Sequence, residues 1–484
     1  MAYLPLLFHA LALAFAVAHA VIQGNATGVC REIDDIISES SDVVYPIQAL
    51  RYTSAIQHWF LTSNDKPACV VEPGSPEDVA LVLQIVGASR TPFAVYCGGH
   101  ASNPGFSSTP GVHISLKRFD QVELSADGKI VTLGFGQGWT DVYDALEDAG
   151  VNVVGGRVPG PGTGGFTLGG GFSWKTNQYG LTCDTVKSFN VVLPNGTITV
   201  ASNQQNKDLF FALKGGLNRF GIVTSAEFYT HPQPPKVWGG LRRYPVLHVP
   251  KLLNATQRFY DESKDPKTQI IVTLEGSGLG VGAMALFFHD GPEKPEIFDM
   301  FDGLLTTIDN TGSKSYKQLI NSFPAQLVLN ARGTFHSFST TKLTGRYIEA
   351  VRAEAEAIGQ VSALHSGTTV SYEIEPFTKY GVHATESAFP HADSLLPLNL
   401  YYAWLNPLED DWWYAKIRQS LATLKQVAKD EGIYEDGFPA YGNYAVAGTS
   451  TEELYGAQNA ARLRVIRDKI DPDRIMDLGG GFEI

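Results

Sequence analysis

The residues best suited to chemistry lie in the short stretch Tyr96-Cys97-Gly98-Gly99-His100-Ala101. Residues 93–96 are apolar and β-prone, so they predict a buried strand that runs directly into two glycines. Gly98 and Gly99 lack a Cβ and can adopt positive φ, so successive N–H groups can point inward as a nest for an anion such as a pyrophosphate. His100 would then lie at the rim of the nest and face the bound group.

A second stretch, residues 160–171, holds seven glycines in twelve residues, which neither a helix interior nor a strand interior tolerates. Its spacing does not fit the G-x-G-x-x-G fingerprint of a Rossmann unit, and no Gly-Lys-Ser/Thr follows as in a Walker loop. Two glycine stretches about sixty residues apart predict a large ligand that is gripped from both sides.

Other common kinds of site are not predicted. The remaining histidines show no metal-ligand spacing, so we expect no metal. No G-x-S-x-G elbow is present, which argues against a serine hydrolase. The net charge of -13 and the pI near 5.4 argue against a nucleic acid or an anionic membrane as partner, because either would need a basic face.

The two glycine stretches belong to a longer series of motifs. In order, the series contains Cys97-Gly98-Gly99-His100, the segment from Asp120 to Gly138, Gly155-Gly156-Arg157-Val158-Pro159, Gly164-Gly165-Phe166-Thr167-Leu168-Gly169-Gly170-Gly171, Gly180-Leu181-Thr182-Cys183-Asp184 and Phe220-Gly221-Ile222-Val223. The series resembles the FAD-binding domain of the berberine bridge enzyme-like oxidases, which belong to the vanillyl-alcohol oxidase and p-cresol methylhydroxylase superfamily.

The resemblance extends to the end of the chain. That family's closing motif is similar to Tyr441-Gly442-Asn443-Tyr444, Tyr455-Gly456, Asn459, Arg462-Leu463 and Asp471-Pro472. The residues at 173–180 are most like those of secreted fungal members tied to secondary metabolism. Similarity therefore covers the chain from about Pro67 onward.

The resemblance implies FAD as cofactor and assigns residues to it. The matching cofactor-binding positions are Cys97, Gly98, Gly99, His100, Ala101, Gly164, Gly165, Gly169, Gly170, Gly171, Asp184, Gly221, Ile222, Val223, Asn443 and Tyr444. His100 matches the histidine that is bonded through a ring nitrogen to the flavin 8α-methyl group. Bicovalent members add a bond from a cysteine at the position of Val158, and valine has no nucleophile, so we expect attachment through His100 only.

Flavin chemistry needs a substrate C–H held over the ring, and a base if an O–H or N–H proton leaves as well. The resemblance favours Tyr441 as the catalytic residue facing the substrate. A phenol has a pKa near 10, so a tyrosine base would need nearby positive charge or hydrogen bonds. Glu373, Tyr402 and Trp404 lie on predicted strands and could also reach the flavin, but alternation alone does not say which side each faces.

The first twenty residues predict secretion. Residues 6–17 form an apolar core too short to span a bilayer, and Ala18-His19-Ala20 fits a cleavage site. No other segment approaches eighteen uninterrupted apolar residues, so we expect no membrane anchor. Passage through the secretory pathway makes the sequons at Asn25, Asn195 and Asn254 candidate glycosylation sites.

The four cysteines allow three connectivities if all of them pair. The resemblance implies the family's N-terminal disulfide between Cys30 and Cys69, and an oxidising compartment favours it. Cys97 and Cys183 either pair with each other or remain two buried free thiols, and we favour free thiols.

The periodicity of apolar residues and the positions of glycine and proline predict the secondary-structure elements and the domains. We expect a signal peptide (1–20), an N-terminal segment (21–66), an FAD-binding domain of two subdomains (67–235), a substrate domain (236–435) and a C-terminal segment that completes the FAD-binding domain (436–484). Prolines at 232–235 mark the linker. Helices are predicted at 295–308, 345–362 and 411–432, with strands at 269–275, 282–289, 368–375 and 398–405 between them. The fold class is α+β, with an antiparallel substrate-domain sheet covered by helices on one face.

The sequence therefore predicts a secreted FAD-linked oxidase that takes hydride from an alcohol or amine carbon of a small molecule, such as a secondary metabolite, with reoxidation by O2. Alternatives within enzymes are an oxidative cyclase of natural-product biosynthesis and a carbohydrate oxidase. A secreted binding or carrier module is the alternative from another class, and the intact glycine and tyrosine motifs argue against it.

Overall fold

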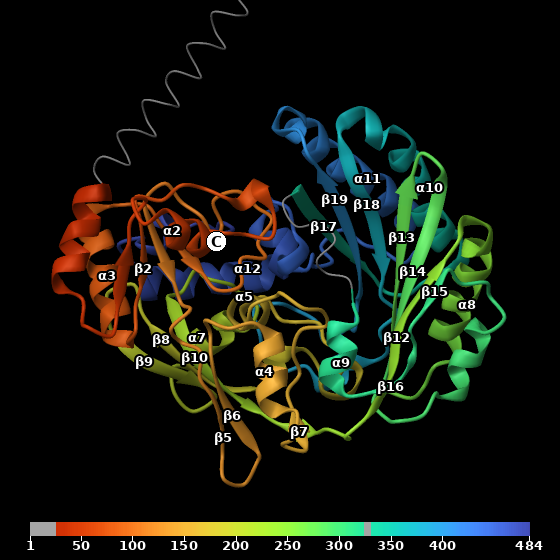
Figure 1. The fold of residues 1–484 in the computed structure, drawn as a ribbon, viewed down its shortest axis with the longest axis horizontal. Helices are drawn as coiled ribbons and strands as arrows, with labels where there is room; N and C mark the ends of the chain where they lie inside the picture. Colours follow the sequence, from red (N-terminus) through yellow and green to blue (C-terminus); the bar gives the residue numbers. More distant parts are fainter. Residues whose placement is uncertain (1–25, 324–330) are drawn as a thin grey trace, which may run out of the picture.

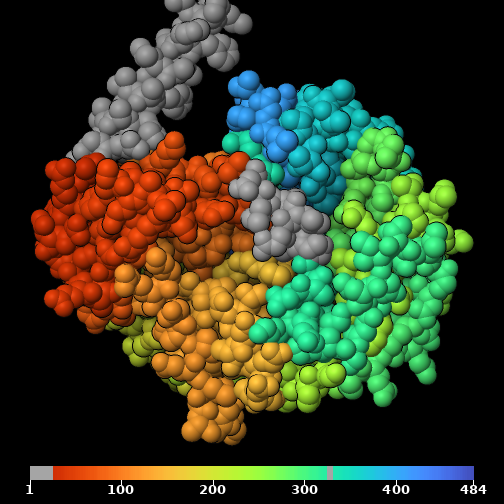
Figure 2. Space-filling view, in the orientation of Figure 1, coloured from red at the N-terminus to blue at the C-terminus, as the bar shows by residue number. Residues whose placement is uncertain are grey.

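The computed structural model describes residues 26–323 and 331–484. Figure 1 shows two lobes, which we name the glycine-loop lobe (26–235 and 436–484) and the large-sheet lobe (236–323 and 331–435). The space-filling view shows the orange part of the first lobe meeting the green part of the second along a seam (Figure 2). Residues from both sides of this seam form the site described below.

The glycine-loop lobe begins with a four-stranded sheet of order β1-β2-β4-β3, in which β1 is antiparallel and the other pairs are parallel. Its strands are β1 (Asp42–Val44), β2 (Cys69–Glu72), β3 (Phe93–Tyr96) and β4 (Val112–Ser115). The helices of this part are α2 (Ala49–Ala55) and α3 (Pro76–Ser89). Helix α3 begins at a capped turn, in which Ser75 Oγ accepts a hydrogen bond from Asp78 N at 3.2 Å and Pro76 follows the cap.

A second, antiparallel sheet of this lobe has the order β5-β6-β10-β8-β9. Its strands are β5 (Val122–Leu124), β6 (Ile130–Gly134), β8 (Val186–Val192), β9 (Ile198–Ser202) and β10 (Ile222–Tyr229). The short strands β7 (Val151–Asn152) and β11 (His231–Pro232) pair separately. Strands β5 and β6 form one hairpin, β8 and β9 form another, and β10 lies in the centre of the sheet. The helices here are α4 (Trp139–Leu146), α5 (Thr163–Leu168), α6 (Thr176–Tyr179) and α7 (Lys207–Leu213).

The large-sheet lobe is built on one antiparallel sheet of order β15-β12-β14-β13-β18-β19-β17, with β16 also pairing with β12. Its strands are β12 (Val237–Tyr244), β13 (Thr268–Ser277), β14 (Gly280–His289), β15 (Ile308–Asp309), β16 (Gly312–Lys314), β17 (Arg332–Thr340), β18 (Gly367–Ile374) and β19 (Leu396–Trp404). Helices α8 (Val249–Glu262), α10 (Gly345–Ser362) and α11 (Asp410–Asp430) cover its outer face, and α9 (Tyr316–Asn321) lies at the seam (Figure 1). The inner face is therefore left for the site.

A close contact fixes helix α10 on the sheet. Gly359 lies in the helix interior, where glycine is normally unfavourable. A Cβ at Gly359 would lie 2.3 Å from Ser277 N, and a Cβ at Gly276 would lie 1.9 Å from Ala355 O. Only glycine at both positions lets the helix backbone approach β13 this closely.

Two sequence predictions in this lobe were wrong or incomplete. The helix predicted at 295–308 is a short 3-10 helix over Glu296–Phe301. It ends because Asp302 takes an extended conformation and its carboxylate contacts Lys294 and Arg242, and Gly303 then adopts a φ of 73°. Strands β12 and β17 were missed, since the first contains Gly-Gly and the second alternates polar residues with few β-branched ones.

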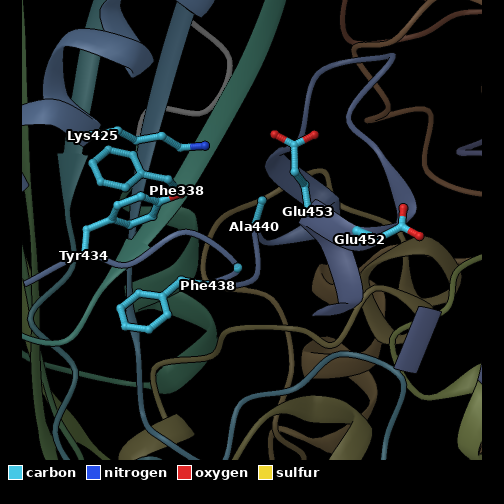
Figure 3. A pocket seen from close by; sticks show the side chains of 8 residues that line it. Phe338, Lys425, Tyr434, Phe438, Ala440, Glu452 and Glu453 are labelled. Carbon is cyan, nitrogen blue, oxygen red and sulfur yellow. The ribbon is translucent and has the colours of Figure 1, made fainter. Parts of the chain in front are cut away.

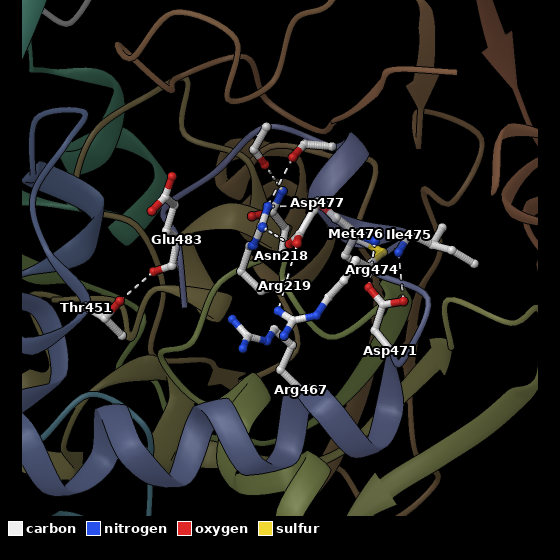
Figure 4. A network of polar contacts seen from close by, with 12 residues as sticks. Asn218, Arg219, Thr451, Arg467, Asp471, Arg474, Ile475, Met476, Asp477 and Glu483 are labelled. Carbon is white, nitrogen blue, oxygen red and sulfur yellow. Dashed lines mark hydrogen bonds and ion pairs between the residues drawn. The ribbon is translucent and has the colours of Figure 1, made fainter. Parts of the chain in front are cut away.

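The C-terminal segment returns to the glycine-loop lobe. Helix α12 (Thr451–Ile470) begins at a capping box made by Ser450 and Glu453. The tail after it is held by backbone and side-chain contacts (Figure 4): Asp471 accepts from Ile475 N and Met476 N at 2.8 and 2.7 Å, and Arg219 donates to the carbonyls of Met476 and Gly479 at 3.0 Å.

The expected disulfide and the two free thiols are present, but Cys97 is only partly buried whereas Cys183 is buried. Cys30 and Cys69 form a disulfide with their Cα atoms 6.1 Å apart, and Cys97 and Cys183 are free. Among the residues described, no helix is long and apolar enough to cross a membrane. The predicted signal peptide and Asn25 lie outside the described residues.

Candidate active site

The two glycine stretches are in direct backbone contact. A Cβ at Gly98 would lie 2.3 Å from Gly162 N, and one at Gly160 would lie 2.4 Å from His100 Nε2. Gly99 adopts a φ of 65°, which turns the chain after β3 as the nest model requires. The pair of loops predicted to grip one ligand is thus assembled into one surface.

The loops also present convergent N–H groups. Burial raises the pKa of the Cys97 thiol, and this rise is opposed by hydrogen bonds from the backbone N–H groups of Gly164, Gly165 and Gly98 to its sulfur. A Cβ at Gly165 would meet nothing within 4 Å. Backbone amides from the two loops therefore gather around the Cys97 sulfur, and Gly165 beside them leaves open space.

His100 lies at the rim of this surface. Its ring stacks on Trp59, with centroids 5.0 Å apart and planes 16° apart. Burial, with a smaller contribution from the charge of His58, lowers the pKa of His100 to about 4. The imidazole is therefore neutral near pH 7 and keeps a lone pair on one ring nitrogen.

The closing motif lies against the second glycine stretch. Gly171 N donates to Tyr441 Oη at 3.0 Å, and Asn443 Nδ2 donates to the same oxygen at 2.9 Å and to Phe166 O at 3.2 Å. A Cβ at Gly169 would overlap the Asn443 side chain at 2.1 Å. Tyr441 is 1% exposed, and its burial raises its pKa to about 12. The structure thus brings Tyr441 and Asn443 together with this loop, while a catalytic role for Tyr441 stays a prediction.

Other predicted cofactor residues lie apart from this contact. Asp184 accepts from Leu181 N at 2.8 Å and from Thr385, and it pairs with His391 Nε2 at 2.8 Å, so it ties the loop after α6 to the large-sheet lobe. Gly221, Ile222 and Val223 start β10 beside Val192, with both apolar side chains buried. Their assignment to the cofactor stays a prediction.

The inner face of the large sheet supplies the opposite wall. Glu373 on β18 pairs with Asn399 on β19, which pairs with Ser337 on β17, so the three form one cross-strand row. Asn399 Nδ2 donates to Glu373 Oε2 at 2.9 Å. Burial raises the pKa of Glu373 to about 7, partly opposed by the Asn399 hydrogen bond.

A buried ion pair lies beside this row and joins three parts of the chain. Arg157 donates to both carboxylate oxygens of Glu375 and, at 2.8 Å, to Tyr444 Oη. Arg157 belongs to the glycine-loop lobe, Glu375 follows β18, and Tyr444 belongs to the closing motif. Tyr444 therefore faces the seam, where it also contacts the ring of Phe335.

Aromatic rings link the histidine loop to this face. Trp59 stacks on Tyr401 (5.8 Å, 26°) and on Phe335 (6.1 Å, 14°), in addition to His100. Tyr402 and Trp404, which alternation left open, point the other way. Tyr402 Oη bonds Ser420 Oγ at 2.8 Å, and Trp404 stacks on Trp413 in the helix-covered core. They are not site residues.

The sequence missed several residues of this site. Trp59 precedes the glycine stretch by about forty residues. The only sequence feature that could have drawn attention to it is the Trp-Phe dipeptide in a polar segment. Asn399 and Tyr401 sit in an apolar strand whose facing could not be assigned. Arg157 lies in the Gly155–Pro159 motif, but its partner Glu375 is 218 residues away in the sequence.

A surface cavity of about 160 Å³ lies elsewhere, next to α11 and the start of α12 (Figure 3). It is lined by Phe338, Lys425, Tyr434, Gly437, Phe438, Ala440, Glu452 and Glu453. Phe338 packs on Tyr347 of α10, so this cavity opens on the helix-covered side of the sheet. Among the described residues, no group of three or more metal-binding side chains is found.

Comparison with known proteins agrees with this geometry. Residues 67–202 match the family model described as "FAD binding domain". The chain is 31% identical over 448 residues to the FAD-dependent monooxygenase tpcD of Cochliobolus heterostrophus, covering 87% of this chain and 85% of the relative.

Solved structures with the same fold include two oxidases. One is 6-hydroxy-D-nicotine oxidase from Arthrobacter nicotinovorans (TM-score 0.79, 20% identity, covering 92% of this chain and 98% of that one). The other is the glucooligosaccharide oxidase of Acremonium strictum, which carries a 6-S-cysteinyl, 8α-N1-histidyl FAD (TM-score 0.77, 20% identity, covering 93% of this chain and 97% of that one). The chain therefore belongs to the family of FAD-dependent monooxygenases and oxidoreductases represented by this relative, and it shares its fold with the two oxidases.

Proposed function

We propose that this protein is a secreted oxidase of small-molecule alcohols or amines, with FAD bonded to His100 and O2 as electron acceptor. The observation that supports it best is the position of Glu373, whose carboxylate is held by Asn399 on the sheet face that bears Tyr401 and contacts the His100–Trp59 stack. When bound, FAD supplies a two-electron acceptor that takes the substrate hydrogen as hydride and passes the electrons to dioxygen, giving hydrogen peroxide.

Glu373 is our candidate for the base. Its raised pKa of about 7 leaves part of the carboxyl ionised at neutral pH, which suits a group that accepts the substrate O–H or N–H proton. Asn399 donates to Oε2, and within the described residues no hydrogen bond to Oε1 is found, so Oε1 can receive the proton. Tyr441, with its pKa raised to about 12, stays protonated at this pH, so we assign it a hydrogen-bonding role toward substrate or cofactor.

We assign His100 as the single attachment residue. Its neutral ring carries the lone pair that a bond to carbon requires. Val158 stands where the bicovalent relatives carry cysteine, and its side chain packs against apolar neighbours. The test is acid precipitation of the purified protein, followed by peptide mapping. Yellow colour in the pellet and a flavin-bearing peptide containing His100 are expected, and release of the colour to the supernatant would remove this assignment.

The oxidase proposal is tested by the amount of hydrogen peroxide formed per substrate oxidised. The purified protein is mixed with candidate alcohols and amines without oxygen, and bleaching of the flavin identifies substrates. On admitting dioxygen we expect one hydrogen peroxide per oxidised substrate, with no external reductant. The relative from Cochliobolus heterostrophus is an FAD-dependent monooxygenase, and monooxygenation is therefore the second candidate reaction. Labelled dioxygen separates them, because an oxidase leaves no labelled oxygen in the organic product and a monooxygenase inserts one atom.

Secretion is proposed from the leader sequence, the Cys30–Cys69 disulfide and two exposed sequon asparagines. Asn195 lies at the tip of the β8–β9 hairpin, and Asn254 projects from α8. Expression of the full chain in a fungal host, with the culture medium assayed before and after endoglycosidase treatment, tests this placement. A product found only inside the cells would reject it.

A further inference from the structure

The surface cavity beside α11 and the start of α12 has an aromatic wall and a charged one. Phe338, Tyr434 and Phe438 form the aromatic wall, and the Lys425 side chain passes along these rings with its ammonium toward the gap (Figure 3). The first turn of α12 and Ala440 lie across the gap. Because these residues come from 236–435 and from 436–484, both lobes line the cavity.

The aromatic wall sets the size and shape of a ligand. The ring centroids of Phe338 and Tyr434 are 5.6 Å apart with planes at 84°, and those of Tyr434 and Phe438 are 5.7 Å apart with planes at 79°. Rings set in this way offer both faces and edges to a further ring. The cavity volume of about 160 Å³ holds one six-membered ring. The wall and the volume therefore favour a ligand with a single aromatic ring.

Lys425 selects the polar end of such a ligand. Its Nζ lies 5.5 Å from the centroid of the Tyr434 ring, and within the described residues it makes no hydrogen bond or ion pair. Burial lowers the pKa of Lys425, and the charges of Glu453 and Asp436 oppose that shift. An ammonium that has lost part of its water without gaining an acceptor is stabilised by a ligand carboxylate.

The acidic side chains across the gap already have partners. Glu452 pairs with Arg464 at 2.7 Å. The Glu453 carboxylate accepts from Ser450 N and Ser450 Oγ at 3.0 and 2.8 Å, as part of the helix cap. Of the charged side chains described around the cavity, Lys425 is therefore the one left for a ligand, and an anion is favoured over a cation.

The cavity also adjoins the segment that leads into the candidate active site. Ala440 lines the cavity, and its N–H donates to Glu453 O at 2.7 Å. The next residue is Tyr441, whose Oη accepts from Gly171 N at 3.0 Å in the second glycine stretch. A ligand that packs on Ala440 therefore contacts a segment that is held at one end by α12 and at the other by the glycine loop.

We propose that this cavity is an effector site for a small aromatic carboxylate with a single ring. The carboxylate accepts hydrogen bonds from Lys425, and the ring packs against the three aromatic side chains and Ala440. The occupied cavity holds the segment before Tyr441 in one position, so a molecule other than the substrate biases the geometry of the active site.

Binding is tested by isothermal titration calorimetry of the purified holoenzyme with benzoate, benzamide and acetate. Benzoate should bind with a Kd below about 1 mM. Benzamide lacks the charge and acetate lacks the ring, so each should bind at least about tenfold more weakly. Absence of benzoate binding, or equal binding of benzoate and benzamide, would overturn the proposal.

Two lysine variants of α11 locate the site. Lys425→Met should weaken benzoate binding at least about tenfold and leave benzamide binding unchanged. Lys416→Met is the matched control, because Lys416 Nζ also lies 5.5 Å from the centroid of an aromatic ring, that of Trp412, outside the cavity. It should bind benzoate as the wild type does. Benzoate binding that does not respond to Lys425→Met would place the ligand elsewhere, the active site included, and would reject the cavity.

The effector role has a separate readout in the flavin absorbance spectrum. At a benzoate concentration that saturates the wild type, the spectrum should shift in the wild type and in Lys416→Met but not in Lys425→Met. Binding that depends on Lys425 without any spectral shift would keep the binding site and overturn its link to Tyr441. Neither measurement requires the substrate of the enzyme to be known.

Discussion

The pKa of Glu373 depends on burial, on neighbouring charges and on a hydrogen bond at the same time. Burial disfavours its charge, the Glu375 carboxylate adds to that effect, and Asn399 and Arg157 oppose it. Because the balance leaves the pKa at about 7, small changes around it alter how much base is present at the pH of the medium. The neighbouring Arg157–Glu375 pair therefore influences chemistry without contacting the reacting atoms.

The first prediction is a pH profile. A base must be ionised to work, so kcat/KM should rise with pH through about 7 and level off above it, since below that value Glu373 is protonated. Glu373→Gln should remove this limb and lower kcat by about 10²–10⁴-fold, with flavin still bound. Initial rates from pH 5 to 9 at several substrate concentrations provide the measurement.

Its control is Glu275→Gln, on the neighbouring strand, where the carboxylate pairs with Arg243 instead. That variant should keep the rise of kcat/KM with pH. If Glu373→Gln also kept this rise, Glu373 would be excluded as the group that titrates. The same raised pKa has a stability consequence: the folded chain binds a proton that the unfolded chain releases, so the free energy of unfolding should fall as pH rises from about 4.5 to about 7.

At the scale of elements, the contact between α10 and β13 is the best place to test packing. Gly359→Ala improves helix propensity by about 1 kcal/mol, yet its Cβ would meet the backbone of Ser277 at 2.3 Å. The clash should dominate, and we expect a net loss of about 1–3 kcal/mol in the free energy of unfolding. Denaturant unfolding of the purified holoenzyme measures it.

Gly345→Ala, at the start of the same helix, is the matched control, because its Cβ would meet nothing within 4 Å. It should be neutral or stabilising by up to about 1 kcal/mol. If Gly359→Ala were as stable as Gly345→Ala, the close approach of helix and strand would not be required by the fold.

Elements also show where sequence reasoning reaches its limit. Ser75-Pro76 and Asp127-Gly128 are local signals, and the helix and hairpin that they predict are present. The direction in which each strand side chain points was harder to predict. Alternation shows that successive side chains point to opposite faces, but it does not show which of them points toward the site. Whether Tyr401 or Tyr402 faces the site depends on which strand pairs with β19 and which helix covers it, and both are tertiary facts.

The residues of the site also divide into those that the sequence predicts and those that it does not. The glycine loops and the closing motif could be predicted because they are continuous in sequence. Trp59, Asn399 and the Arg157–Glu375 pair could not, because each acquires its role from a partner far away in the chain.

At the scale of the whole molecule, the two lobes must hold one ligand between them, and buried polar ties keep them in register. Besides Arg157–Glu375, Lys175 in the glycine-loop lobe donates from Nζ to Asp290 Oδ2 at 2.8 Å. Gln178 donates to the same oxygen at 3.1 Å, and both ionic side chains are at most 4% exposed. Burial lowers the pKa of Lys175, and Asp290 opposes that shift.

The last prediction concerns this tie. Asp290→Ala leaves a buried ammonium without its partner, which should cost about 3–5 kcal/mol, whereas the double variant Lys175→Met with Asp290→Leu removes both charges and should recover most of the loss. The surface variant Glu262→Ala, which removes the partner of Arg258, should change stability by less than about 1 kcal/mol. Thermal and denaturant unfolding of all three give the comparison. A lobe-joining role also predicts that Asp290→Ala raises KM while the flavin stays bound, because the sheet face moves relative to the glycine loops. A single variant as stable as the wild type, with unchanged KM, would show that the seam is held by its apolar contacts alone.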